Sequence, residues 1–186
     1  MEAIKVVNRR ASLKACLSGK KIDKADLIEV LNAARSAPSG KNQQPTRFLV
    51  VTDEALIKKL ASEAFSEGNA MVGQAPVLIF ACANPKDAIA RDGQNYYLFD
   101  AGLAMENLLL AATDLGLATH VMTGYRETEV KRILALPEEI RVVAATPLAC
   151  PPQKSYEEAA KDRLAGRTRK GLQEIAFLNT WGKGLA

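Results

Sequence analysis

Six consecutive apolar residues, Val77 to Cys82, follow Pro76 near the middle of the chain. In a strand, side chains alternate between the two faces of a sheet, so this run predicts a strand that is covered on both faces. Residues 95–115 are expected to form one cover, since apolar residues recur there at helical spacing and Gly116 follows where a helix commonly ends. The expected buried face of this helix contains Leu98, Ala101, Met105, Leu108, Leu109 and Ala112, and the small residues Ala101, Gly102 and Ala104 suggest close packing.

The same patterns predict the remaining elements of a single domain that spans residues 1–186. Helices are expected at residues 23–35, with Asp23 as the cap, at residues 53–64, capped by Asp53, and at residues 127–134. Strands are expected at residues 48–51, 117–122 and 142–150. The tail after Tyr156 is mixed and basic, and its apolar residues, at 175–178 and at Trp181, have no predicted helix or strand of their own to pack against. Such a tail is expected to dock on a partner subunit.

The sequence excludes several common kinds of catalytic site. His120 is the only histidine, so a Ser/His/Asp or Cys/His catalytic group and a multi-histidine metal site cannot be built. The chain also has no phosphate loop of the Walker type and no GxGxxG segment after a strand. If the protein is an enzyme, a bound cofactor is therefore expected to carry the reaction, and no metal site is predicted.

Composition restricts the partners that the protein is expected to have. Aromatic residues make up 5% of the chain, too few for a nucleic-acid surface of interleaved basic and aromatic side chains. The most apolar long stretch, residues 98–117, carries three acidic residues and Asn107, which favours a core helix over a membrane span. Cys16, Cys82 and Cys150 have no paired spacing, which predicts reduced thiols and a cytoplasmic location.

Four short segments have residues that a core would not require. They are Arg10-Ala11-Ser12-Leu13-Lys14, the segment Ala-Pro-Ser-Gly-Lys-Asn-Gln-Gln-Pro at residues 37–45, residues 116–125 with Thr123-Gly124-Tyr125 at their end, and Arg-Thr-Arg-Lys-Gly-Leu-Gln-Glu-Ile at residues 167–175. Basic residues cluster around the first and the last segment, so two clusters that are distant in sequence could converge on one anion. In identity, order and spacing, the four segments resemble the FMN-dependent nitroreductase family, and the resemblance covers most of the chain.

The resemblance implies a fold and a set of binding residues. The fold is α+β, a nitroreductase-like three-layer sandwich in which helices flank a mostly antiparallel central sheet, in an intertwined homodimer with FMN at the subunit interface. The implied cofactor-binding residues are Arg10, Ala11, Ser12, Lys14, Pro38, Ser39, Gly40, Asn42, Gln44, Thr123, Gly124, Arg167 and Arg169.

The basic residues in this set suit the phosphate and the ring of a flavin. A flavin phosphate is a dianion, so Arg10 with Ser12, and Arg167 with Arg169, would supply two groups of charge-assisted donors. The family places a lysine equivalent to Lys14 near the pyrimidine edge of the flavin, where a fixed positive charge stabilises the reduced ring. An ordinary surface lysine is the alternative for Lys14.

The polar and glycine residues have two interpretations each. Ser39, Asn42 and Gln44 are expected at the ribityl chain and the polar ring edge, although residues of these types also occur in turns for backbone geometry alone. Gly124 would let a backbone N–H approach the redox-active ring nitrogen, or it is required only by its own turn.

The predicted function is an FMN-dependent NAD(P)H oxidoreductase that reduces nitroaromatic, quinone or related acceptors by a ping-pong hydride transfer, with no catalytic residue beyond the flavin. Two alternatives remain open: a flavin storage or sensor protein without turnover, and a family relative that acts on flavin or on a halogenated substrate. The chain departs from the family pattern at Thr46, where an aromatic residue is common, and at Thr123, where a second glycine is common. Both positions bear on the shape of the acceptor. His120 and Arg47 match no family role.

Overall fold

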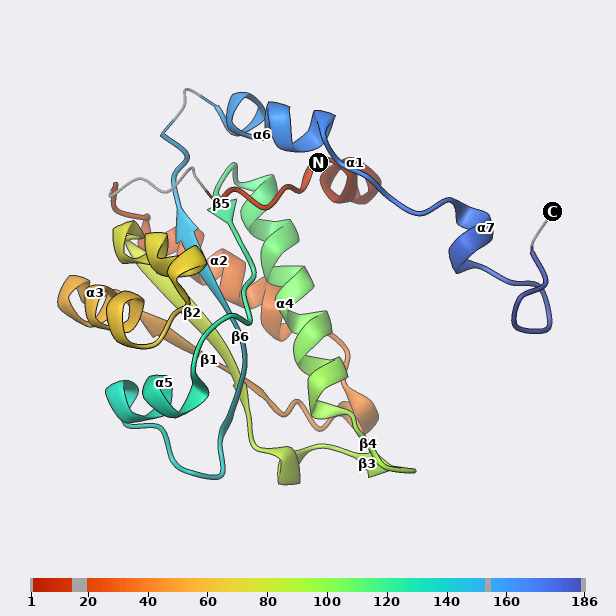
Figure 1. Ribbon diagram of the computed structural model, residues 1–186, viewed down its shortest axis with the longest axis horizontal. Coiled ribbons are helices and arrows are strands. Elements are labelled where there is room, and N and C mark those ends of the chain that lie inside the picture. Colours follow the sequence, from red (N-terminus) through yellow and green to blue (C-terminus); the bar gives the residue numbers. More distant parts are fainter. Residues whose placement is uncertain (1, 15–19, 153–154, 185–186) are drawn as a thin grey trace.

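A computed structural model describes residues 2–14, 20–152 and 155–184 of the chain (Figure 1). A four-stranded sheet in the order β1-β2-β6-β5 lies between two layers of helices, and every neighbouring pair of strands is antiparallel. The predicted three-layer α+β sandwich is thus confirmed. The strands of the sheet are β1 (Thr46–Val51), β2 (Val77–Ala83), β5 (Ala118–Thr119) and β6 (Arg141–Ala149), and the helices are α1 (Ala3–Arg9), α2 (Lys24–Arg35), α3 (Glu54–Glu63), α4 (Tyr97–Asp114), α5 (Glu127–Leu134), α6 (Tyr156–Ala165) and α7 (Leu172–Ile175).

The strand β2 lies inside the sheet and is buried along its whole length, as the apolar run predicts. Its alternate residues Val77, Ile79 and Ala81 pack with α2 and α4 in one hydrophobic cluster. Leu78, Phe80 and Cys82 pack on the other face, in a second cluster with α3 and α5. The sheet therefore separates two cores, and β2 contributes side chains to both of them.

The helix α4 confirms the predicted long cover, and Gly116 follows it with a φ of 75°, the left-handed conformation that favours glycine. Two details of the prediction are wrong. Leu98 is 51% exposed, because the buried positions of the first turn are Tyr97 and Asp100. Gly102 is also exposed, and a Cβ at this position would meet nothing within 4 Å, so it is not required for close packing.

Other boundaries differ from the predictions for local reasons. The side chain of Asp53 caps α3 through the amide of Leu56, at 2.8 Å, whereas Asp23 makes no cap hydrogen bond to α2. The strand expected at residues 117–122 is reduced to the two residues of β5, followed by an isolated bridge between Met122 and Ala145. Short 3-10 helices, η1 (Gly40–Asn42), η2 (Glu67–Gln74) and η3 (Pro85–Asp87), and a small hairpin of β3 (Ala90–Arg91) and β4 (Gln94–Asn95) complete the described body.

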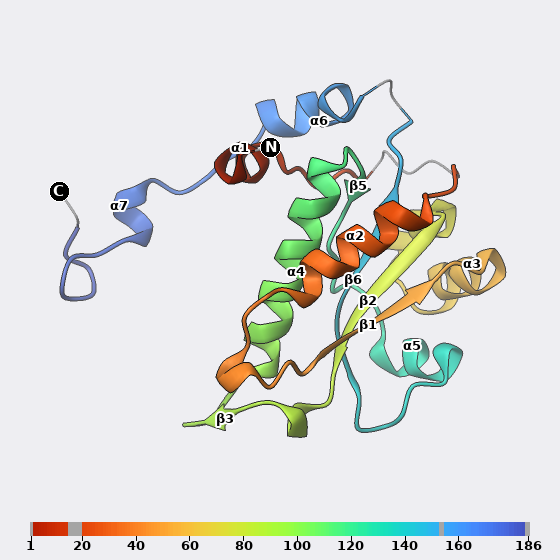
Figure 2. The same ribbon diagram turned by 180° about the vertical axis from the view of Figure 1, so that it is seen from behind.

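The C-terminal region divides into a packed helix and an arm. The helix α6, which the sequence patterns do not predict, packs against the body through the buried Tyr156 and Ala160. Residues 166–184 then run away from the sheet, and both views show α7 and the end of the chain apart from the body (Figures 1 and 2). Trp181 in this arm is 91% exposed. Within the described residues, no helix is long and apolar enough to cross a membrane.

Candidate functional site

The N-terminal segment Arg10 to Lys14 is held at the edge of the sheet beside β5. Ser12 forms a parallel bridge with Thr119, and the amide of Leu13 donates to the Thr119 carbonyl at 2.9 Å. The amide of Ala11 donates to the hydroxyl of the buried Tyr156 at 2.9 Å. The backbone of this segment is therefore fixed from two sides, which leaves the half-buried side chains of Arg10, Ser12 and Lys14 at defined positions.

Arg10 and Arg167, which are distant in sequence, lie side by side. The guanidinium of Arg167 donates to the carbonyl of Asn8 at 3.1 Å and to the carbonyl of Arg10. In the part of the chain that the structure describes, the buried Nε of Arg10 has no hydrogen-bond partner, and it lies 3.6 Å from a carboxylate oxygen of Glu106 on α4. The structure thus brings the two basic segments together, with the guanidinium of Arg10 next to the carboxylate of Glu106. Arg169 is exposed, and its guanidinium donates to the neighbouring Thr168 carbonyl at 2.7 Å.

Lys14 and Gly124 lie against the same loop, at residues 66–69. The ammonium of Lys14 is 3.8 Å from the position that a Cβ on Gly68 would take. On the other side, the carbonyl of Gly124 accepts the amide of Ser66 at 3.0 Å and the side-chain amide of Asn69 at 3.4 Å. A Cβ on Gly124 would lie 2.7 Å from the side-chain nitrogen of Asn69 and 3.1 Å from the hydroxyl of Ser66, so a larger residue here would displace these two side chains. Ser66 and Asn69 are site residues that sequence patterns do not reveal.

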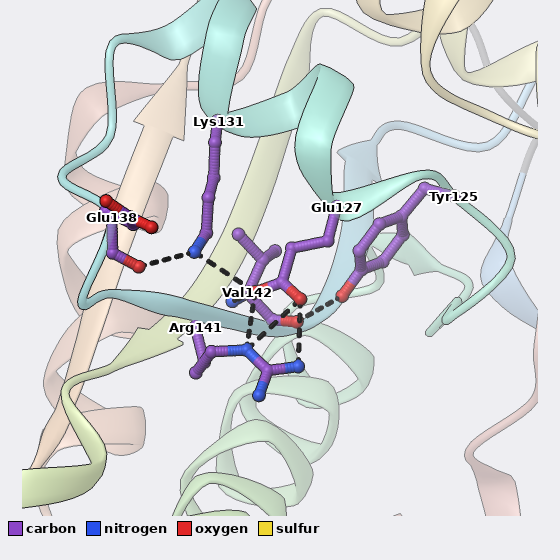
Figure 3. A network of polar contacts seen from close by, with 6 residues as sticks. All are labelled: Tyr125, Glu127, Lys131, Glu138, Arg141 and Val142. Carbon is purple, nitrogen blue, oxygen red and sulfur yellow. Dashed lines mark hydrogen bonds and ion pairs between the residues drawn. The ribbon is translucent and has the colours of Figure 1, made fainter.

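The turn that contains Thr123 and Gly124 is held to β6 at both ends. Before the turn, Met122 bridges to Ala145; after it, the hydroxyl of Tyr125 donates to the Val142 carbonyl at 2.8 Å. Figure 3 shows the polar network that continues this attachment through Glu127. The carboxylate of Glu127 accepts two hydrogen bonds of 2.9 Å from the guanidinium of Arg141, through Nε and Nη2. It accepts a third, of 2.8 Å, from the amide of Val142.

Burial raises the pKa of Glu127, but the hydrogen bonds from Arg141 and from the Val142 amide outweigh it and lower the pKa below its ordinary value. The carboxylate therefore stays charged at neutral pH. Lys131, one helical turn further along α5, lies 3.8 Å from the same carboxylate. These contacts give the turn a rigid support from the sheet.

His120, which follows Thr119, adjoins Lys14. Its pKa is lowered by burial, and then by the positive charges of Lys14 and Arg163. The imidazole is consequently neutral at pH 7. Its Nδ1 is buried and has no partner among the described residues, while its backbone amide donates to the Thr146 hydroxyl at 3.1 Å.

The second polar segment forms a turn with an unusual backbone. Lys41, Asn42 and Gln44 have φ values of 49°, 56° and 49°, in the left-handed region. This conformation is favourable for asparagine but uncommon for lysine and glutamine, so other contacts must maintain the turn. The hydroxyl of Ser39 accepts the Gln44 amide at 2.9 Å, and the Gly40 amide donates to Asp100 in the first turn of α4 at 3.2 Å.

A cavity of about 700 Å³ lies between this turn and the start of α4. Pro38, Ser39 and Gly40 line one side of it, and Phe99 and Asp100 line another. A volume of this size is typical of small-molecule sites. We call it the Asp100 cavity.

Within one chain, the backbones of the two groups of predicted site residues are attached at opposite ends of α4, although the side chain of Arg10 reaches Glu106 in the middle of the helix. Gly40 bonds to Asp100 near the start of this helix, whereas Arg9 donates to the carbonyl of Thr113 near its end, at 2.8 Å. With a rise of 1.5 Å per residue, these attachments are about 20 Å apart along the helix. Figure 1 shows the same separation, with α1 and β5 at one end of α4 and β3 and β4 at the other.

Comparison with known proteins gives a consistent result. The profile of the Nitroreductase family matches residues 7–70 and 66–149. A protein of Archaeoglobus fulgidus, provisionally named as an NADH dehydrogenase/NAD(P)H nitroreductase, is 34% identical over 167 residues, which are 88% of this chain and 93% of that protein. An FMN reductase [NAD(P)H] of Bacillus subtilis is 27% identical, over 68% of this chain and 50% of that one. The crystal structure of a nitroreductase family protein from Clostridium novyi NT has a TM-score of 0.77 and 31% identity, with coverage of 100% and 97%.

Proposed function

This chain belongs to the nitroreductase family, and from that premise we propose that it is an FMN-dependent oxidoreductase that takes electrons from NADH or NADPH and passes them to a nitroaromatic, a quinone or a related acceptor. The Bacillus subtilis relative that is named an FMN reductase supports both the cofactor and the electron donor. The observation that carries the proposal is the meeting of the Arg10 and Arg167 segments.

The residues around Arg10 fit a phosphate group. Its buried Nε has no hydrogen-bond partner among the described residues and lies 3.6 Å from the carboxylate of Glu106, and a phosphate dianion would supply a stronger charged acceptor. The hydroxyl of Ser12 lies two residues further along the same fixed backbone. Arg167 would act mainly by holding the carbonyls of Asn8 and Arg10, and hence the position of the site. Arg169, whose side chain is exposed, is proposed as the second charge on the phosphate.

Lys14 and Gly124 fit the polar edge of the ring. Both lie against residues 66–69, and Lys14 would place a positive charge where the reduced ring becomes anionic. Thr123 and Gly124 would present backbone groups from a turn that β6 holds on both sides. The neutral His120 fits this arrangement, because a second positive charge is not added beside Lys14.

The bound flavin would supply the redox chemistry, a two-electron exchange with the nicotinamide and the acceptor, which occupy the same pocket in turn. The protein would bind and orient the three molecules and exclude water. No side chain is required as an acid or base at the hydride step.

We further propose that the protein is a homodimer, because one chain holds only part of the site. The ribityl chain is attached directly to the flavin phosphate. Ser39, Asn42 and Gln44 can therefore contact the ribityl chain only if they lie near Arg10. Their turn is attached to α4 at Asp100, about 20 Å along the helix from the attachment of Arg9 at Thr113 and about 9 Å from Glu106, which the side chain of Arg10 approaches. A second copy would bring its own turn to Arg10. The exposed arm at residues 166–184 suits the same assembly, since its apolar side chains lack a cover within the described chain.

The proposal is tested with purified protein. We expect a yellow protein that releases FMN when denatured, and steady-state oxidation of NADH or NADPH that depends on an added quinone or nitroaromatic. Protein that stays colourless after titration with FMN, without quenching of flavin fluorescence, would refute the proposed cofactor. Flavin binding without nicotinamide oxidation would instead identify a storage or sensor protein, and product analysis separates an enzyme that degrades flavin or removes a halogen.

A further inference from the structure

One face of the helix α4 has no cover in the described part of the chain. Its exposed or half-buried residues are Leu98, Phe99, Gly102, Leu103, Glu106 and Leu110. From Phe99 to Leu110 the successive intervals are four, three and four residues, the spacing of a seam along which two helices pack. Phe99 is 61% exposed, and both views show α4 at the edge of its layer, with α2 on one side only (Figures 1 and 2). We call these six residues the outer face of α4.

Gly102 lies inside this 18-residue helix, where glycine is less favourable than alanine. Nothing in the described chain requires it: its φ is not in the left-handed region, and a Cβ would meet no atom within 4 Å. A glycine at a helix surface allows the backbone of a second helix to approach closely. The outer face therefore contains a position that suits close contact with a helix from outside the chain.

The charged residues on and beside the outer face decide the direction of such a helix. Lys41 and Arg91 are exposed and line the Asp100 cavity at the start of α4. Glu106, whose side chain is 46% exposed, lies further along, next to Arg10. If two copies of this face packed in parallel, their Lys41 and Arg91 side chains would lie together and repel. An antiparallel pair separates these charges, turns them towards Glu106 and opposes the two helix dipoles, so the charges favour a second copy in antiparallel orientation.

The proposed shared site determines where the two helices cross. It requires the Ser39 turn of one copy beside Arg10 of the other. The turn is attached at Asp100, and the Arg10 side chain approaches Glu106. In a symmetric antiparallel pair these two positions face each other when the two-fold axis passes midway between them, at residue 103. Gly102 adjoins this point, where the helices come closest, so the axis and the glycine agree although separate observations place them.

We propose that two copies of the chain pack their α4 helices antiparallel across a two-fold axis at Gly102 and Leu103, and that this contact carries the Ser39 turn of each copy to Arg10 of the other. The inference rests on the proposed function, and it names the surface that completes the proposed site. Phe99 and Leu110 extend the contact on either side of the axis. The interface is the same patch on both copies, and it creates two equivalent FMN sites, one on each side of the axis.

The test uses cysteine substitutions, because a two-fold axis brings a residue beside its own copy only near the axis. In L103C the two cysteines meet there, and mild oxidation of the full-length protein with bound FMN should join them in a disulfide. The matched control is L98C, the same substitution on the same face. Its two copies would lie about 15 Å apart along the helices, beyond the Cα separation of about 4–7 Å that a disulfide spans. The parent chain, treated alike, accounts for its own three cysteines.

Non-reducing electrophoresis should show a covalent dimer in L103C and monomers in L98C and in the parent chain. If neither variant crosslinks in a protein that sediments as a dimer, the proposed face is wrong. Equal crosslinking of both variants assigns the product to random collision and also overturns the inference.

G102L provides a second measurement. In its own chain a Cβ at this position meets nothing, and leucine is the better helix former, so the variant should fold. Overpacking between the two helices should raise the dissociation constant of the dimer at least about tenfold in sedimentation. An unchanged constant overturns the contact at Gly102.

FMN titration of the same samples separates this inference from the proposed function. If L103C crosslinks but the protein binds no FMN, the proposed function fails and the α4 contact stands. If FMN binds at full stoichiometry and L103C does not crosslink, the α4 contact is wrong and the cofactor assignment stands.

Discussion

The hydroxyl of Tyr156 lies 2.9 Å from the amide nitrogen of Ala11, although 145 residues separate the two in the chain. The guanidinium of Arg9 lies over the ring of the same tyrosine, 4.7 Å from its centre. Through these contacts the helix α6 fixes the segment that begins the proposed phosphate site. The position of Arg10 therefore depends on a helix near the other end of the chain.

Replacing Tyr156 with Phe should lower the free energy of unfolding by about 1–3 kcal/mol, because the Ala11 amide loses its buried acceptor. FMN affinity should also fall, since the adjacent Arg10 loses a fixed backbone. Denaturant unfolding and fluorescence titration measure the two effects. Tyr97 is a matched control: it is buried too, but its hydroxyl has no hydrogen bond within the described structure. If Y97F and Y156F lower the free energy of unfolding by the same amount, the hydrogen bond between Tyr156 and the Ala11 amide makes no specific contribution to stability.

Replacing Arg10 with Ala should weaken FMN binding about tenfold to a hundredfold, the loss expected for one charge-assisted hydrogen bond. Riboflavin, which lacks the phosphate, provides the control ligand. It should bind the parent protein more weakly than FMN does, and R10A should barely change its affinity. Equal losses for both ligands would indicate general destabilisation, and no loss for FMN in a folded variant would remove Arg10 from the phosphate site.

Replacing Glu106 with Gln should tighten FMN binding, because the carboxylate lies 3.6 Å from the guanidinium of Arg10 and competes with a phosphate for it. The side chain of Glu106 is about half exposed, so the expected gain is small, about twofold to fivefold at low salt. The control is E157Q, which removes a similar ion pair from the neighbouring Arg9. Weaker FMN binding in E106Q would mean that Glu106 orients Arg10 rather than competing for it.

The Glu127 network should make stability depend on pH in a predictable direction. The folded state holds the pKa of Glu127 below its ordinary value of 4.5, so the network stabilises the protein fully above that value and is lost as the pH falls through the lowered pKa. At pH 7, E127Q should be less stable by about 1–2 kcal/mol. The difference between parent and variant should shrink steadily below pH 4.5 in denaturant titrations. A difference that is constant down to pH 2 would contradict an ionised Glu127.

Deleting residues 172–186 should remove both the dimer and the flavin, because the arm carries Leu172, Ile175 and Trp181 as exposed apolar side chains and the cofactor site is proposed at the interface. Sedimentation and flavin content give the two readouts. W181S, a single change in the arm, should weaken the dimer without abolishing it. A stable monomer with a full complement of FMN after the deletion would disprove the shared site.

The sequence predicts those parts of the fold that depend on local patterns. The run from Val77 to Cys82 predicts β2, and the apolar spacing before Gly116 predicts α4. Both predictions succeed because the pattern of burial, on two faces of a strand or along one face of a helix, depends on residues that are close in sequence. The helix α6 is missed because it buries only Tyr156 and Ala160, too few to give a periodic signal.

Long-range pairings are the part of the site that sequence patterns do not reveal. The basic clusters predict a meeting of the two chain ends, and Arg167 does reach the Arg10 carbonyl. Which atoms meet depends on the packing of α6, and the distance between the Arg10 segment and the Ser39 turn depends on the length of α4. In the sequence, Asp100 looks like an ordinary polar residue of a helix. Its hydrogen bond with Gly40 joins positions that are 60 residues apart, so a local pattern does not reveal it.

The separation of the two polar segments along α4 has a genetic consequence for the proposed dimer. Consider one chain altered at Arg10 and another altered in the turn at Ser39, each severely enough that a pair of its own kind binds no flavin. When both are expressed in one cell, a mixed pair contains one site in which both defects meet and one site built entirely from unaltered segments. Two inactive alleles of a single gene should therefore complement each other, with the mixed pair reaching half the activity of the parent pair.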